Sequence, residues 1–73
     1  MVAMTPNSEV CVRIDLGRFI ANAMRAGVRL TTQEAAIFLR EWGFEYQGEG
    51  YWRCPADRLD VLHDDEIDEV RPG

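Results

Sequence analysis

The sequence predicts an α+β fold in which two amphipathic helices pack on a small antiparallel sheet, in the order β-α-α-β-β with room for a fourth strand. Apolar side chains recur at helical spacing in residues 16–24 and 31–42. They alternate with polar ones in residues 10–14 and again in residues 44–54, around two glycines. An apolar fraction of 47% in 73 residues is enough for one small core.

Residues 1–9 are expected to be a flexible leader in front of a single domain, residues 10–73, that ends in an acidic segment. The alternation in residues 10–14 predicts a short first strand. Asp15 then stands where a helix N-cap would, and Gly27 where that helix would end. Between them an apolar face repeats at spacings of three and four, on Leu16, Phe19, Ile20, Ala23 and Met24.

The chain is organised around residues 31–54, which contain both tryptophans and both tyrosines. Thr31 and Glu34 match a capping box, the pattern that begins many helices. Gly43 supplies the left-handed position that commonly ends one. Beyond it, aromatic and polar side chains alternate up to Pro55, with glycines at the reversal, so a β-hairpin is expected to follow the helix.

After Pro55 the pattern supports two interpretations. Residues 58–62 have the rhythm of a strand, and we expect a further strand there, although Leu59 and Leu62 also fit one turn of helix. Residues 63–70 fit either a short amphipathic helical turn or an acidic tail. The core expected from all these elements comprises Val12, Ile14, Leu16, Phe19, Ile20, Ala23, Ala35, Phe38, Leu39, Trp42 and Trp52.

Charge limits the classes of function. Thirteen acidic residues stand against eight basic ones, all arginine, for a net charge of -5. An acidic domain repels the phosphate backbone, so direct nucleic-acid binding is not expected, whereas a basic partner is favoured. The sequence has no signal peptide and no apolar run of membrane-spanning length, which predicts a cytoplasmic protein. For such a protein, Cys11 and Cys54 are expected to be reduced rather than bridged.

No catalytic, cofactor or metal motif is visible. Cys11, Cys54 and His63 are the only soft metal ligands, and their spacing is not that of a zinc site. The acidic run after His63 lacks the glycine and the alternating ligands of an EF-hand loop. Cys54 and His63 could be drawn as a nucleophile and its base, but nothing in the sequence brings them together. We therefore expect neither an enzyme nor a bound cofactor.

Two nucleic-acid-related families have a partial likeness to the chain. LTTQEAA, residues 30–36, resembles the opening of the helix-turn-helix in excisionase-type regulators, and the order of helices and hairpin is similar to a winged helix. However, one helix runs on to Trp42, and the candidate wing tip carries Glu49 instead of a basic residue. LREWGFEYQGEGYWR, residues 39–53, resembles small toxins with a double-stranded-RNA-binding-like fold, without the histidine that those toxins carry after the turn.

The remaining hypothesis is protein binding. The hairpin is rich in aromatic side chains, one of which, on an exposed strand face, would be an interface anchor. In size, acidity and lack of catalytic motifs the chain resembles small phage-encoded inhibitors of the anti-CRISPR type. That resemblance implies nucleic-acid mimicry on a basic, nucleic-acid-binding surface of a partner protein. The chain itself is expected to be a monomer or weak dimer. A winged-helix-like DNA-binding regulator is the alternative. The expected partner-binding residues are Asp57, Asp60, Asp64, Asp65, Glu66, Asp68, Glu69, Glu49 and Tyr51.

Overall fold

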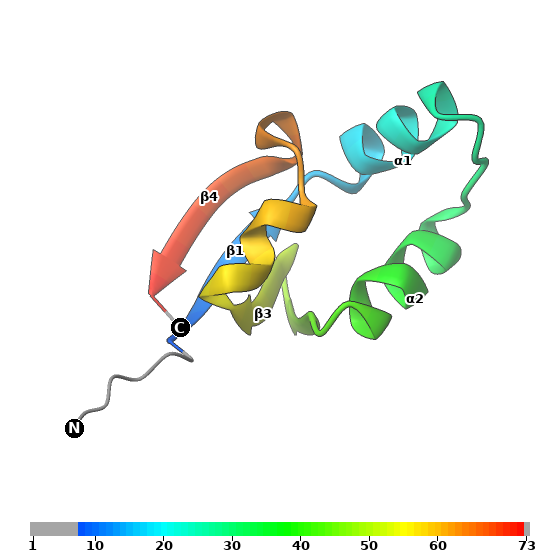
Figure 1. Cartoon of the computed structure of the whole chain (residues 1–73). Coiled ribbons are helices and arrows are strands. Elements are labelled where there is room, and N and C mark those ends of the chain that lie inside the picture. The colour runs from blue at the N-terminus through cyan, green and yellow to red at the C-terminus, as the bar shows by residue number, and fades with distance from the viewer. Residues whose placement is uncertain (1–7, 73) are drawn as a thin grey trace.

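A computed structural model describes residues 8–72 of the chain (Figure 1). Its sheet has four antiparallel strands in the order β2-β3-β1-β4. The strands are β1 (Glu9–Ile14), β2 (Glu45–Gly48), β3 (Tyr51–Pro55) and β4 (Ile67–Pro72). The helices are α1 (Leu16–Arg25), α2 (Thr32–Glu41) and the 3-10 turns η1 (Ala56–Val61) and η2 (Asp64–Glu66). The predicted α+β fold is confirmed. Of the expected leader, residues 1–7 lie outside the described residues, and Glu9 already belongs to β1.

The sheet has one covered face and one open face. Val12 of β1 lies opposite Trp52 of β3 on one side and Val70 of β4 on the other. Because side chains alternate along a strand, all three point to the same face. The helices and η1 cover that face with Phe19, Ala35, Leu39 and Leu62. The open face carries the polar half of the alternation: Glu9, Cys11, Arg13, Glu45, Tyr51, Arg53, Glu69 and Arg71.

The ends of the two α-helices form as their sequences predict. The Thr31 hydroxyl accepts a hydrogen bond from the Glu34 N–H at 3.1 Å, and the Glu34 carboxylate accepts one from the Thr31 N–H at 2.9 Å. Asp15 caps α1 by accepting from the Arg18 N–H at 3.0 Å. Gly43 follows α2 with a φ of 97°, a conformation that glycine adopts without strain.

The C-terminal third differs from the prediction. The prediction of a strand at residues 58–62 is wrong, because η1 covers most of this stretch. Both edges of β3 are already taken by β1 and β2, so the chain that leaves Pro55 has no free neighbour there and turns away from the sheet. Residues 63–70 are neither a helical turn alone nor a tail: η2 is followed by β4, which pairs with the free edge of β1.

The buried core also differs in part from the core that the sequence predicts. Val12, Ile14, Phe19, Ala35, Leu39 and Trp52 are buried as expected. Leu16, Ile20, Ala23 and Trp42 are only half-buried, and Phe38 is exposed. Phe44, Cys54 and Leu62 complete the core without having been predicted. Phe38 lines an open hollow between α1, α2 and Val61 of η1, so part of its side chain stays exposed.

The two cysteines lie on opposite faces of the sheet. Val10, not Cys11, is the partner of Cys54 in the β1–β3 register, so the Cys11 side chain points to the open face while that of Cys54 points into the core. A disulfide needs side chains that point towards one another. Both cysteines are free, as predicted.

Candidate functional site

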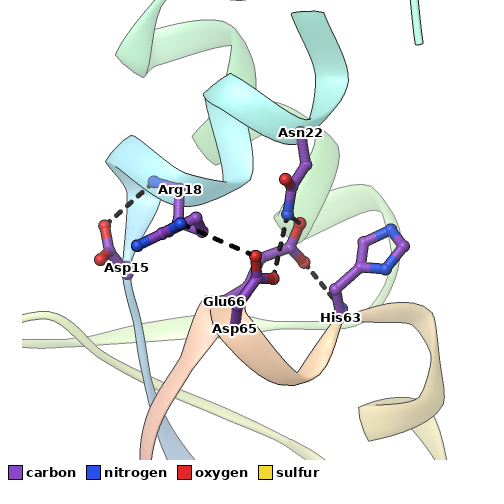
Figure 2. A network of polar contacts seen from close by, with 6 residues as sticks. All are labelled: Asp15, Arg18, Asn22, His63, Asp65 and Glu66. Atoms are coloured by element: carbon purple, nitrogen blue, oxygen red, sulfur yellow. Dashed lines mark hydrogen bonds and ion pairs between the residues drawn. The ribbon is translucent and has the colours of Figure 1, made fainter. Parts of the chain in front are cut away.

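One of the nine expected contact residues, Glu66, is part of the interior. Its side chain is 2% exposed. One carboxylate oxygen accepts a hydrogen bond from the Asn22 amide at 2.8 Å, and the other accepts one from the His63 N–H at 2.9 Å (Figure 2). The Glu66 carbonyl accepts from the Asp15 N–H at 2.8 Å. The expectation that Glu66 contacts a partner is therefore corrected: it joins η2 to α1 and to the end of β1.

Five of the expected residues are exposed aspartates along the stretch from η1 to β4. Asp65 accepts a hydrogen bond from the Asn22 amide at 3.1 Å and lies 4.0 Å from Arg18 (Figure 2). Asp68 is the extra residue of a bulge, since Arg13 pairs with Glu69 while Ile14 pairs with Ile67. The full set, called here the aspartate series, is Asp57, Asp60, Asp64, Asp65 and Asp68.

Tyr51 and Glu69 belong to a different surface, the open face of the sheet. The Tyr51 hydroxyl donates to a Glu69 carboxylate oxygen at 2.6 Å and accepts from the Arg71 guanidinium at 2.6 Å. The Arg71 guanidinium also lies 4.2 Å from the centre of the Tyr51 ring, close enough for a cation–π contact. The hydrogen bond from Tyr51, followed by the one from Arg71, lowers the pKa of Glu69. These side chains are engaged with one another and not with the aspartate series.

Glu49 lies on a third part of the surface, the turn between β2 and β3. Its φ of 56° places it among the left-handed positions of that turn, beside two glycines. The nine expected residues are thus divided among the interior, the aspartate series, the open face and the hairpin tip. The sequence alone does not show which way each element faces, so it could not separate these surfaces.

An apolar groove of about 280 Å³ lies between α1, α2 and η1, and no pattern in the sequence predicted it. Its floor includes Phe19 and Trp42, whose ring centres are 5.9 Å apart. Three large apolar side chains on its walls remain open to solvent: Val28 at 46%, Phe38 at 38% and Val61 at 37%. We call this the helix groove. Two valines could have indicated the groove in the sequence: Val28, which follows Gly27, and Val61, which follows Asp60. Isolated valines next to turns are common, so neither one marks a binding site by itself.

The helix groove is acidic at one end. A second hollow, lined in part by Asp65, shares Asn22, Ala26 and His63 with it. The buried carboxyl group of Glu66 also reaches the groove wall. Asp60 and Asp64 are the exposed chain neighbours of Val61 and His63. The groove therefore offers apolar contact along its length and continues into a hollow lined by one exposed acidic residue, Asp65, and one basic residue, Arg25.

Cys54 and His63 do not share a surface. Cys54 is 1% exposed in the core, and burial raises the pKa of its thiol to about 11. A thiol with that pKa is protonated near neutral pH and is a poor nucleophile. His63 is exposed and lines the helix groove. Within residues 8–72, no three His, Cys, Asp or Glu side chains are grouped to hold a metal ion.

A winged helix would be expected to bring Arg29, Arg40 and Arg53 to one face, but Arg40 and Arg53 lie beside opposite faces of the sheet. Arg53 lies on the open face, where it forms ion pairs with Glu45 at 2.6 Å and Glu9 at 3.3 Å. Arg40 projects from α2 and borders a hollow beside Trp52 on the covered face. The hairpin that would act as the wing carries Glu49 at its tip. This arrangement offers no shared basic surface on which Arg40 and Arg53 meet.

None of the helices in residues 8–72 has the length and apolar character needed to cross a membrane. Comparisons with protein-family models, with curated proteins and with solved structures find no match to this chain.

Proposed function

We propose that this chain is a non-enzymatic, acidic protein-binding module, and that the helix groove with its acidic end is its binding surface. One observation carries the proposal: Val28, Phe38 and Val61 are all exposed around the same groove. Exposed apolar side chains gathered in one place, with polar groups around them, are typical of binding sites.

The charge of the surface indicates the kind of partner. Of the aspartate series only Asp65 lies within 4.0 Å of a basic side chain in residues 8–72, and that ion pair, with Arg18, is at the limit. The other four keep their charge free for a partner. The occupant that fits is a basic segment with an apolar side chain for the groove and arginines or lysines for Asp60, Asp64 and Asp65. Charge complementarity of this kind increases the association rate and the specificity.

Inhibition by nucleic-acid mimicry follows from the same features. Exposed carboxylates such as those of the aspartate series can take the place of phosphates on a basic surface that otherwise binds nucleic acid. The apolar groove adds contacts that a phosphate backbone does not offer. Under this proposal the chain and nucleic acid compete for the same partner, and only the chain keeps part of its affinity at high salt.

The proposal is tested by titrating the chain with a synthetic helical peptide of arginine and leucine while recording backbone and methyl NMR spectra. We expect shifts that saturate at Val28, Phe38 and Val61, and none with a matched glutamate and leucine peptide. The double variant Asp60→Lys/Asp64→Lys should bind at least about tenfold more weakly.

The control is Glu41→Lys/Glu49→Lys, which makes the same change in net charge at exposed positions on α2 and the hairpin turn, whereas Asp60 and Asp64 are the chain neighbours of the groove residues Val61 and His63. It should bind within about twofold of the unchanged chain. Equal losses in the two variants would mean that net charge alone drives binding, and would contradict a defined site. Binding of duplex DNA in place of the peptide would favour the winged-helix alternative.

A further inference from the structure

Among the residues that the structure describes, no strand pairs with the outer edge of β4. Within residues 8–72, β4 pairs only with β1, and it forms the end of the order β2-β3-β1-β4. Figure 1 shows it as the long strand along one border of the molecule. An edge strand presents unpaired N–H and C=O groups, which makes it a template for another strand. At six residues, β4 is longer than β2, the four-residue strand at the opposite edge.

The backbone bonds of β1 show which groups of β4 point outwards. The Ser8 carbonyl accepts from the Ala56 N–H at 2.8 Å, and the Ile14 N–H donates to the Gly50 carbonyl at 3.1 Å. Even-numbered residues of β1 therefore direct their peptide groups towards the β3 side. Backbone groups alternate along a strand, so the odd-numbered Cys11 and Arg13 face β4.

The partners of Cys11 and Arg13 on β4 are Arg71 and Glu69. The backbone N–H and C=O groups of these two residues therefore form the hydrogen bonds to β1. Val70, between them, must then direct its N–H and C=O to the free edge. Its side chain lies on the covered face of the sheet, yet it is 48% exposed.

The side chains that flank Val70 can pair with the same side chains of a second copy of the strand. Glu69 and Arg71 carry opposite charges, and both lie on the open face. When a second copy of β4 is placed antiparallel with Val70 opposite Val70, Glu69 of each copy lies opposite Arg71 of the other. Two cross-strand ion pairs then form on one face and one valine contact on the other. Other symmetric registers, centred on Glu69 or Arg71, place like charges opposite each other.

We propose that this chain forms a symmetric dimer by antiparallel pairing of β4, so that one sheet runs through both copies. At its centre, each Val70 donates its N–H to the Val70 carbonyl of the other copy. Pro72, which has no N–H, and the bulge at Asp68 confine the pairing to the middle of the strand. A short pairing with one favoured register gives a weak, specific dimer. It uses a different surface from the helix groove and does not depend on the proposed function.

Sedimentation equilibrium of the whole chain over rising concentration is the first test. We expect a monomer–dimer equilibrium that weakens with salt, because the flanking ion pairs are exposed. Val70→Pro removes only an outward N–H, a position where sheets tolerate proline, so the fold and its circular dichroism should persist while the dimer is lost. A chain that stays monomeric up to about 1 mM would overturn the proposal.

A charge exchange tests the register and does not depend on the proline. Glu69→Arg and Arg71→Glu each place like charges opposite each other in a homodimer, and each should dimerise at least about tenfold more weakly. In an equimolar mixture of the two single variants, both ion pairs form again between one copy of each variant. The double variant Glu69→Arg/Arg71→Glu also regains both ion pairs, in this case between two identical copies. Recovery in both cases is the expected result. Failure of both to recover, or a Val70→Pro chain that dimerises normally, would rule out pairing through β4.

Discussion

The Glu66 carboxylate accepts a hydrogen bond at 2.8 Å from the side-chain amide of Asn22, a residue 44 positions earlier in the chain. The same carboxylate accepts from the His63 N–H, so it holds the turn before β4 against α1. A buried carboxyl group is tolerated only where hydrogen bonds replace the water it has lost. Glu66 therefore stabilises the route by which the chain returns to the sheet, and with it the position of η2 beside the helix groove.

Removing that carboxylate should destabilise the fold. Glu66→Ala leaves the His63 N–H without its acceptor and the Asn22 amide with Asp65 alone, at a cost of about 1–3 kcal/mol in the free energy of unfolding. Urea denaturation followed by tryptophan fluorescence measures the change. Asp68→Ala, at the exposed bulge, is the matched control and should change the free energy by less than about 0.5 kcal/mol. If both variants unfold at the same urea concentration, the Glu66 contacts contribute nothing to stability.

The two cysteines should differ in reactivity. With a pKa of about 11 and almost no exposure, Cys54 should resist a thiol reagent at pH 8 in the folded chain, while Cys11 on the open face reacts. Mass spectrometry after digestion identifies the labelled site. In urea both should react at similar rates. Labelling of Cys54 first under native conditions would contradict its place in the core.

The raised pKa of Cys54 also has a consequence for stability. The folded state keeps the thiol proton above the unfolded pKa of about 9.0, where the unfolded chain releases it. Its contribution to stability is therefore complete below about pH 9 and is lost as the pH rises towards about 11. Cys54→Ala lacks this titration, so the difference in stability between the two proteins should change over that window and stay constant below it. A constant difference throughout would contradict the shift.

Local signals predicted the first two thirds of the fold, and long-range pairing decided the rest. The capping box at Thr31 and the glycine after α2 depend on neighbours within a few residues, and both formed as expected. Strand β4 depends on a free edge of β1 more than fifty residues away, which no local pattern reveals. Likewise, Glu66 has the same appearance in the sequence as its exposed acidic neighbours, and only the folded chain distinguishes it, by burying its carboxylate against Asn22 and the His63 N–H. The helix groove could not be predicted because it forms where three separate elements meet.

The open face offers a test of how Tyr51 affects a neighbouring carboxylate. The hydrogen bond from the Tyr51 hydroxyl is the main reason why the pKa of Glu69 is lowered, so Tyr51→Phe should raise that pKa towards its ordinary value. Carbon-detected NMR titration of the Glu69 carboxyl group measures it. Tyr46→Phe is the control, because the Tyr46 hydroxyl accepts from the Gly50 N–H and does not touch Glu69.

The sign of the accompanying stability change follows from the lowered pKa. The folded state favours ionised Glu69, so this group stabilises the fold above its unfolded pKa of about 4.5, and that contribution is lost as the pH falls through the folded value. Tyr51→Phe should therefore lose stability relative to the unchanged chain at pH 7 and converge with it in acid. An unchanged Glu69 titration in the variant would show that the hydroxyl is not the cause.

Val61 and Leu62 are adjacent, and they should separate binding from folding. Leu62 is 7% exposed in the core, whereas Val61 is 37% exposed on the wall of the helix groove. Leu62→Ala should lower the free energy of unfolding by about 2–5 kcal/mol, since it leaves a cavity. Val61→Ala should cost less than about 1 kcal/mol but weaken binding of the arginine and leucine peptide, because it removes apolar contact from the groove. Urea denaturation and peptide titration of both variants test this. A Val61→Ala chain with unchanged affinity would mean that the groove wall does not contact the partner.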